Sequence, residues 1–466
     1  MIDTAEFFRC PPIIKIIRSM TQDIKTSLTP WKEYEKFIFR LFFVYFFIQV
    51  VPLDWKFFKE LFSINWLDLH YGDIFNLTRY APKFYTPTES FYNWGIVVLI
   101  ALLGAVIWTI ADNKNKEYNL LYYWLRVIVR YRLAIGIIGY GFLKFFPLQA
   151  PYPSISNLNT HYGDFSDWKI FSLSLGIVPG YESFLGLVEI IAGLLLLYRK
   201  TATIAAFIVV VFTGNVFMSN LAYEGGEQVY SLYLISLALF LLAFDVPRLY
   251  ILFGKEQGVK PNRFMPFYSE NWQRTGRITL KGLTIFFFVF LYGFKTYSGA
   301  HTDPYQFPKE AGLKDASGIY DVSEFRINNQ VLPYSASDPV RWKDVVFEKW
   351  ATLSIRSNRP VQLQHLAVEQ VVEKDEDRIY ELAGSGGRHY YNYRIDEQKG
   401  QLFLQNKNEN YSSEKLVLQF SRPNKDQVIL SGVNERNDSI YVVLNKIPKK
   451  YLLKEASDGR GKPIKL

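Results

Sequence analysis

The chain has 466 residues, enough for two or more domains, and its single cysteine, Cys10, excludes an internal disulfide and a CxxC redox pair. Aromatic residues make up 17% of the chain and the formal net charge is +9, but the basic residues cluster beside apolar runs, which favours membrane topology over nucleic-acid binding. Residues before about position 300 are mostly apolar or aromatic, and those after it are mixed and polar. The sequence therefore predicts a membrane protein with a polar C-terminal domain.

Seven apolar runs are each close to the roughly twenty residues that a membrane-spanning helix needs. They are Phe37–Leu53, Trp94–Ala111, Tyr123–Phe146, Phe184–Tyr198, Ala202–Ala222, Val229–Phe244 and Thr279–Tyr297. Basic residues gather before the first run, after the second and fourth, and between the sixth and seventh. By the positive-inside rule, residues 1–36 form a cytosolic amphipathic segment and the C-terminal third lies in the periplasm. We expect the protein in the inner membrane of a bacterium with a two-membrane envelope.

A duplicated tetrapeptide organises the helical part, because His70–Asp73 (HYGD) recurs as His161–Asp164. Arg40-Leu41 and Arg132-Leu133 precede the two copies, and Glu89–Phe91 and Glu182–Phe184 follow them. All three pairs are separated by 91 to 93 residues. Three matches in order at one offset predict an internal duplication of a helix–loop–helix unit, with the first repeat at residues 37–120. Both HYGD loops are then expected on the same outer side.

The histidine and aspartate of each copy lie three residues apart, so His70 can face Asp73 and His161 can face Asp164 on one turn. Such a pair fixes the tautomer of the imidazole. If pseudo-symmetry brings the two pairs together, they form a metal site or a proton relay. The alternative is structural: Gly-Asp ends a turn, tyrosine anchors it at the interface, and histidine packs beside it. We favour the structural alternative and keep the four residues as candidate catalytic groups.

The fourth run resembles a helix of the DoxX-like membrane proteins. It reads FLGLVEIIAGLLLLYRK over Phe184–Lys200. The second helix of that family carries an acidic residue, a glycine four positions later and a basic residue at its cytosolic end, which here are Glu189, Gly193 and Arg199. The segment Arg132–Lys144 looks like the family's first helix.

This resemblance covers roughly residues 125 to 248 and implies a DoxX-like helical bundle within residues 121–300. The family includes the small subunits of thiosulfate:quinone oxidoreductases. The resemblance therefore implies quinone-linked chemistry and makes quinone the cofactor class to consider.

Glu189 is the strongest candidate site residue, because an ionisable group at membrane depth costs roughly 2.5–3.5 kcal/mol unless it is paired or solvated. The alternative is a structural carboxylate bonded to a neighbouring helix. Glu224 and Glu227 flank two glycines in a short outer loop, where they either cap the sixth helix or face the same outer cavity as Glu189. Asn215 in the fifth run is suited to hydrogen bonds across helices. We take Glu224, Glu227 and Asn215 as candidate cofactor-binding residues.

Residues 301–466 predict an all-β domain, since short alternating runs recur there between turn residues. The expected strands are Ile319–Ile327, Thr352–Arg356, Gln362–Val372, Arg378–Leu382, His389–Ile395, Gln401–Gln405, Lys415–Phe420, Gln427–Leu430, Ser439–Leu444 and Tyr451–Lys454. Short strands in succession favour an antiparallel meander, either closed as a barrel or folded as a sandwich. Lipocalin-like closure is preferred because nearly every connection is short.

Two functions follow from these observations. The first is a non-catalytic envelope or complex subunit, whose β-domain binds a lipid or a protein partner in the membrane or periplasm. The alternative is a quinone- or lipid-associated oxidoreductase component, with Glu189 and the two HYGD pairs around a site at the outer leaflet. The Walker, Rossmann, zinc-protease and Gly-x-Ser-x-Gly motifs are absent from the sequence, so the motifs do not decide whether the protein is an enzyme, and we expect no metal.

Overall fold

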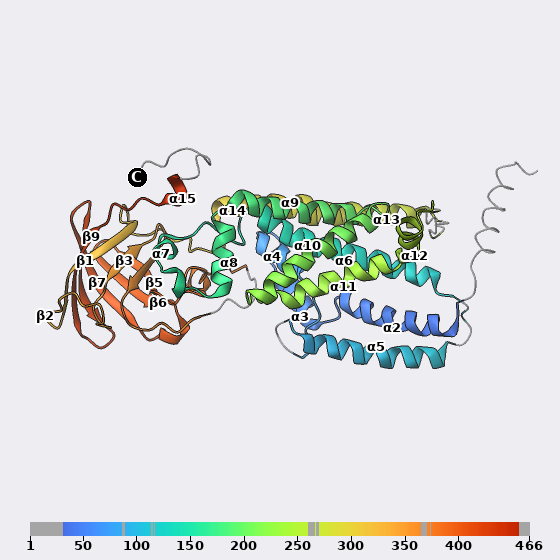
Figure 1. The fold of residues 1–466 in the computed structure, drawn as a ribbon, viewed down its shortest axis with the longest axis horizontal. Helices are drawn as coiled ribbons and strands as arrows, with labels where there is room; N and C mark the ends of the chain where they lie inside the picture. The colour runs from blue at the N-terminus through green and yellow to red at the C-terminus, as the bar shows by residue number, and fades with distance from the viewer. Residues whose placement is uncertain are drawn as a thin grey trace, which may run out of the picture. The chain divides into compact units, whose positions relative to one another are not determined.

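The structure, a computed structural model, describes residues 31–85, 89–112, 115, 117–259, 266, 270–364, 371–372 and 374–455 (Figure 1). Cys10 and most of the expected cytosolic segment 1–36 lie outside the described residues. The chain divides into two compact units. The first takes residues from Met1–Leu53, Pro82–Val129 and Asn262–Pro266, and the second takes Asp54–Ala81, Arg130–Pro261 and Phe267–Leu466.

The first unit is built on helices α2 (Glu33–Val50) and α5 (Phe91–Ala111), which pack together. Arg40 of α2 is 2% exposed. Its guanidinium donates to the Thr109 hydroxyl at 2.9 Å, to the Asp112 carbonyl at 2.9 Å and to the Tyr118 hydroxyl at 2.7 Å. These bonds satisfy a cation that is otherwise costly to bury.

The second unit contains the remaining helices and the β-domain. Its helical segments are α3 (Trp55–Ser63), α4 (Tyr71–Thr78), most of α6 (Asn119–Phe145), α7 (Ile155–Leu158), η1 (Tyr162–Asp164), α8 (Asp167–Gly176), α9 (Pro179–Leu196), α10 (Ala202–Ala222), α11 (Gln228–Ala243), α12 (Val246–Leu249), η2 (Tyr250–Gly254), α13 (Asn271–Ile285), η3 (Phe286–Leu291), α14 (Tyr292–Thr302), η4 (Asp375–Asp377), η5 (Glu409–Tyr411) and α15 (Leu452–Glu455). Helices α13, η3 and α14 follow one another without a break.

Five helical segments of the described residues are long and apolar enough to cross a membrane. A sixth is counted if α11 and the following α12–η2 segment, which bend by 64°, form one span. The predicted third run is the 27-residue helix α6, which carries three arginines and Lys144 and is not among these five. The structure therefore contains five or six apolar helices where the sequence predicts seven spans.

Residues Asp54–Ala81, which lie between α2 and α5 in sequence, belong to the second unit, where α4 is buried. Tyr71 is 1% exposed. At the other end of α4, the buried Arg132 donates to the Thr78 carbonyl at 2.6 Å and to the Tyr80 carbonyl. A cation at a helix C-terminus satisfies carbonyls that have no partner within the helix and complements the helix dipole. The first HYGD copy thus begins a buried helix, whereas the sequence predicts an outer loop.

Helices α6 and α9 approach each other closely at two glycines. A Cβ on Gly186 would lie 2.3 Å from the backbone nitrogen of Phe145, and one on Gly193 would lie 2.4 Å from Cγ1 of Ile138. Small residues let helix backbones approach in membrane proteins. This close approach brings side chains of α9 within reach of those of α6.

The β-domain is a closed antiparallel barrel of eight strands (Figure 1). The strands are β1 (Gly318–Ile327), β3 (Asp344–Phe347), β4 (Thr352–Arg356), β5 (His389–Asp396), β6 (Gln401–Asn406), β7 (Lys415–Asn424), β8 (Gln427–Asn434) and β9 (Ser439–Lys446). Each pairs with the next in sequence, and β9 closes the barrel on β1. The short strand β2 (Gln330–Val331) pairs with the end of β1. The predicted antiparallel meander is confirmed, and it forms a barrel rather than a sandwich.

Several predicted strands are wrong or fall elsewhere. Arg378–Leu382 forms no strand, because Arg378 turns toward the helices and pairs with Asp303 at 2.7 Å. Tyr451–Lys454 lies mostly in helix α15. Within Gln362–Val372, residues 362–364 are not a strand and residues 365–370 lie outside the described part of the chain. Strand β3 was not predicted, because all four of its residues are buried and show no alternation.

The barrel interior is filled by side chains. Alternate residues of the strands, such as Leu402 and Leu404 of β6 and Val442 and Leu444 of β9, form one buried cluster. Every member of that cluster is at most 8% exposed. A barrel of about eight strands is just wide enough for its own side chains to fill.

Candidate functional site

A cavity of about 220 Å³ lies inside the second unit. It is lined by the C-terminal halves of α6 and α10 and by the N-terminal halves of α9 and α11, which meet at one end of these helices. Helix α8 also contributes to the lining. The polar and phenolic residues around it are Tyr140, Lys144, Gln149, Ser172, Tyr181, Glu182, Glu189, Thr213, Asn215, Ser219, Asn220, Glu227, Tyr230 and Ser231.

Lys144 and Glu189 form a buried ion pair on the cavity wall. The Lys144 Nζ donates to Glu189 Oε1 at 2.6 Å, and the two side chains are 11% and 6% exposed. The second carboxylate oxygen, Oε2, has no hydrogen-bond partner among the described residues. The structure agrees with the structural interpretation of Glu189, because one carboxylate oxygen bonds to Lys144 of the neighbouring helix α6. It also agrees with the functional interpretation, because the other oxygen is a hydrogen-bond acceptor at the cavity.

Glu227 forms a second charged group on the same cavity. Its carboxylate oxygens accept from Nη2 of Arg79 at 2.8 and 3.0 Å, and Oε2 also accepts from the Tyr140 hydroxyl at 2.9 Å. Glu227 occupies the N-cap position of α11, but its side chain does not cap the helix. Arg79, which follows α4, pairs with it across 148 residues of sequence.

The other predicted cofactor-binding residues divide between the cavity and the surface. Asn215 lines the cavity together with Glu189 and Glu227. Glu224 is exposed, has a φ of 52° and is not among the lining residues. Sequence analysis did not select Lys144 or Arg79, although Lys144 lies in the segment that resembles the first DoxX-like helix.

The first HYGD copy caps a helix. His70 Nδ1 accepts from the Gly72 backbone at 3.1 Å, and the Asp73 carboxylate accepts from the His70 backbone at 2.9 Å, which together form a capping box. The other imidazole nitrogen, Nε2, lies 3.3 Å from the carboxylate of Asp303. This copy therefore has a structural role at the start of α4.

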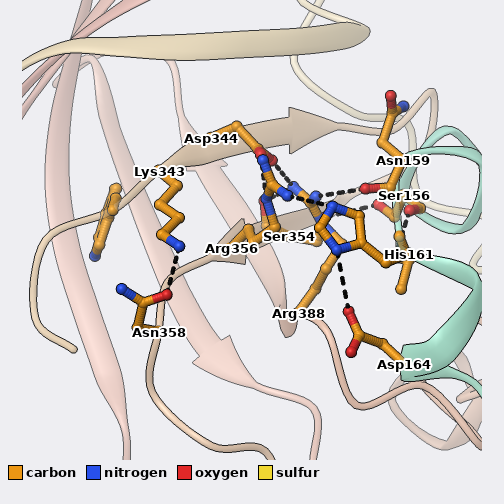
Figure 2. Close-up of polar contacts among 12 residues, drawn as sticks. Ser156, Asn159, His161, Asp164, Lys343, Asp344, Ser354, Arg356, Asn358 and Arg388 are labelled. Atoms are coloured by element: carbon orange, nitrogen blue, oxygen red, sulfur yellow. Dashed lines mark hydrogen bonds and ion pairs between the residues drawn. The ribbon is translucent and has the colours of Figure 1, made fainter. Parts of the chain in front are cut away.

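The second HYGD copy lies against the barrel (Figure 2). His161 is placed between Arg356, whose Nη1 is 2.9 Å from Nε2, and Asp164, whose Oδ2 is 3.8 Å from Nδ1. The second distance is too long for a hydrogen bond. Since arginine only donates, Nε2 is the acceptor and Nδ1 carries the proton. Both side chains of this His-Asp pair are solvent-accessible, at 72% and 43%.

The two copies have different partners, His70 contacting Asp303 and His161 contacting Arg356. Within the described ranges, no group of three or more His, Cys, Asp and Glu side chains could hold a metal ion. The joint metal site that pseudo-symmetry would make is therefore not formed. The cavity, which brings together Glu189, Glu227 and Asn215, is therefore taken as the candidate functional site.

A buried polar network attaches the helical part to the barrel (Figure 2). Glu348, just after β3, accepts from the backbone nitrogens of Ser156 at 2.6 Å and Ile155 at 3.2 Å. On β4, Ser354 shares a 2.7 Å hydrogen bond with the Ser156 hydroxyl and accepts from Arg388 at 2.8 Å. Burial and the neighbouring Glu381 carboxylate raise the pKa of Glu348 to about 7, against the effect of the two hydrogen bonds from α7.

This pKa predicts that the protein loses stability as the pH rises from about 5 to about 7. The folded state binds the Glu348 proton more tightly than the unfolded state does, so the stabilisation is complete below the unfolded pKa and is lost as the pH passes the folded one. A shift from 4.5 to about 7 corresponds to roughly 3 kcal/mol. Glu348→Gln should flatten the dependence of the melting temperature on pH over this interval.

Lys169 provides an internal check on that measurement. Its burial lowers the pKa to about 7, so above pH 7 the unfolded state binds the extra proton and stability should rise again. The melting temperature, plotted against pH, should thus pass through a minimum near neutral pH. A profile that Glu348→Gln leaves unchanged would contradict the assignment to Glu348.

No protein-family model, curated protein or solved structure matches this chain. The resemblance of Phe184–Lys200 to the DoxX-like proteins therefore stays a prediction. What the structure adds is a cavity between apolar helices with a charged pair on its wall.

Proposed function

We propose that the helical part binds the polar head of a membrane-soluble amphiphile, of the quinone or lipid class, in the cavity lined by Lys144 and Glu189. The observation that carries this proposal is the buried Glu189 carboxylate, which has one oxygen held by Lys144 and the other without a partner among the described residues. Buried polar groups are normally hydrogen-bonded. A ligand group that donates to Oε2 would complete the site.

The size and lining of the cavity favour a head group over a whole molecule. At about 220 Å³ it is smaller than sites that enclose a drug-sized ligand, roughly 300–1,000 Å³. The ring of Phe212 and the rings of Tyr140 and Tyr230 offer flat apolar faces beside the charged groups. A quinone ring has carbonyl oxygens that Lys144 can contact, and a hydroquinone has the hydroxyl that Glu189 Oε2 can accept. The DoxX-like resemblance implies the same class.

The proposal includes the membrane context predicted from the sequence. We count α6 as a seventh span, because Arg132 is buried against the end of α4 and Lys144 is paired with Glu189. Seven spans with a cytosolic N-terminus place the barrel in the periplasm and the ligand cavity toward the outer leaflet of a bacterial inner membrane. The barrel is then a soluble domain carried by the bundle, with lipocalin-like closure.

The test is native mass spectrometry of the protein extracted gently from its own membrane into lipid nanodiscs. Glu189→Gln should lower the occupancy of a bound quinone or lipid about ten- to a hundredfold, the effect of losing a hydrogen bond to a charged group. Glu324→Gln, on the outside of the barrel, serves as the matched control. A quinone or lipid retained at full occupancy by Glu189→Gln and by Lys144→Met would refute the proposal.

A second candidate function is a subunit that docks a protein partner on the barrel. Since the interior is filled, a partner would have to bind the outside, where Phe403, Val417 and Val433 form an exposed apolar row across β6, β7 and β8. In the same native spectra, a stoichiometric protein retained by Glu189→Gln and lost in Phe403→Glu would support this function. If the partner is retained by both Glu189→Gln and Phe403→Glu, then neither the cavity nor the exposed row on the barrel is its binding site.

A further inference from the structure

Helix α8 is shared by the cavity and the barrel. One face presents Trp168, Phe171 and Ser172 to the cavity. Residues of the same helix also contact the barrel turn formed by residues 380–386, and Figure 1 shows α8 between the barrel and helices α10 and α11 of the same unit. The cavity lies at one end of α6, α9, α10 and α11, and α8 contributes to the lining at that end.

The barrel turn forms hydrogen bonds with the N-terminal end of α8 and with the residues just before it. The Ser166 backbone donates to the Gly384 carbonyl at 2.8 Å, and the Gly386 backbone donates to the Asp164 carbonyl at 2.8 Å. Lys169, which is fully buried, donates to the Tyr380 carbonyl and lies 3.7 Å from the centre of the Tyr380 ring. These contacts are satisfied only while α8 stays against the turn.

The side chain of Ser172 connects the cavity directly to the barrel turn. The Ser172 hydroxyl lines the cavity and lies 2.8 Å from the hydroxyl of Tyr380. At the C-terminal end of α8, Gly176 packs so closely that a Cβ there would lie 2.4 Å from the Pro151 carbonyl oxygen. The C-terminal end of α8 is thus closely packed at Gly176, and its N-terminal end is held by the barrel turn. A rotation of α8 about Gly176 would move its N-terminal end away from the turn.

We propose that α8 is a gate on the side of the cavity next to the barrel, and that the barrel turn of residues 380–386 holds α8 in place. The identity of the ligand rests on the proposed function, but the gating is a property of α8 and the turn. Displacing the turn removes the partners of Ser166, Lys169 and Ser172 together, so α8 moves away from the turn and the cavity becomes more accessible on that side.

The experiment measures access to the cavity without a ligand. In a Cys10→Ser background, Thr213→Cys places a thiol on the cavity wall, where the native threonine is 4% exposed. Its rate of labelling by a water-soluble maleimide, on the full-length protein in nanodiscs, reports opening. Phe165→Cys with Ser385→Cys adds a lock, because these residues face each other in an antiparallel bridge and disulfides span such Cα separations.

The gate is released by Gly384→Ala. Gly384 has a φ of 67°, and a Cβ there would lie 2.3 Å from the Ser166 hydroxyl and 3.0 Å from Cβ of Lys169. The matched control is Gly400→Ala, which has a similar φ of 63° and its nearest neighbour at 3.7 Å, away from α8. Tyr380→Phe, which removes only the hydroxyl bonded to Ser172, is the milder releasing variant.

The oxidised lock should slow labelling of the Thr213→Cys thiol about tenfold, and a reductant should restore the rate. Gly384→Ala should speed labelling about tenfold, the effect of losing a hydrogen bond of ordinary strength, and Gly400→Ala should not. Labelling at one rate in the locked, released and control proteins would overturn the gate. Because no quinone or lipid enters this assay, its result stands apart from that of the ligand experiment.

Discussion

Replacing Glu381 with alanine should lower the free energy of unfolding of the barrel by roughly 3–5 kcal/mol, because it leaves a buried charge without its partner. Glu381 and Lys407 form an ion pair of 3.0 Å with both side chains fully buried. Trp350 also donates its indole nitrogen to Glu381. Urea denaturation followed by tryptophan fluorescence would measure the loss.

The double variant Glu381→Gln with Lys407→Met separates the charge from the packing. It removes both charges, keeps an acceptor for Trp350, and should recover most of the lost stability, since replacing a buried pair by neutral groups is often neutral. The pair of Lys399 with Asp396, at 3.7 Å, is the control, and Lys399→Ala, which removes only the exposed side chain of the pair, should change stability by less than about 0.5 kcal/mol. A double variant as unstable as Glu381→Ala would contradict this account.

Gly186→Val should separate α6 from α9 and destabilise the bundle by roughly 3 kcal/mol, at the upper end of the usual cost of overpacking. The atoms that a Cβ would meet are the Phe145 nitrogen at 2.3 Å and the Gly141 oxygen at 2.5 Å. Both belong to the backbone, so a rotamer change cannot relieve the clash. Lys144 and Glu189 lie on the same two helices, so the proposed site should lose its capacity for a quinone or lipid as well.

The melting temperature in nanodiscs and the native mass spectrum measure the two consequences. Gly214→Ala is the matched control, since its Cβ would have nothing within 4 Å and α10 should gain helix propensity. Gly186→Val with unchanged melting temperature and full ligand occupancy would show that the close approach of α6 and α9 is not required.

The strands of the barrel could be predicted from sequence where one face of the strand is buried and the other is exposed to solvent. Strands β6 to β9 alternate between buried and exposed residues, so their period of two is visible in the residue types. Arg378–Leu382 shows a similar pattern but is a turn, in which Arg378 pairs with Asp303 at the end of α14 and Tyr380 bonds to Ser172 of α8. Periodicity reports which residues are buried, and it does not report what buries them.

The candidate site could be predicted in part. Glu189 was chosen because it is an ionisable group in an apolar run, and Glu227 because it follows two glycines in a short loop from which it could face the same cavity; both line the cavity. Their partners could not be chosen in the same way. Lys144 and Arg79 resemble the other basic residues that end apolar segments, and only the folded chain brings them to the two carboxylates.

The sequence by itself determined the order of the parts: apolar helices first, then a meander of strands that contains the residues of a closed barrel. These features follow from local hydrophobic patterns, which act over one helix or one strand. The tertiary structure alone decided that the two HYGD copies differ, one capping the buried helix α4 and the other exposed against the barrel. Identical tetrapeptides have identical local preferences, so their different roles come from the surroundings into which the rest of the chain packs them.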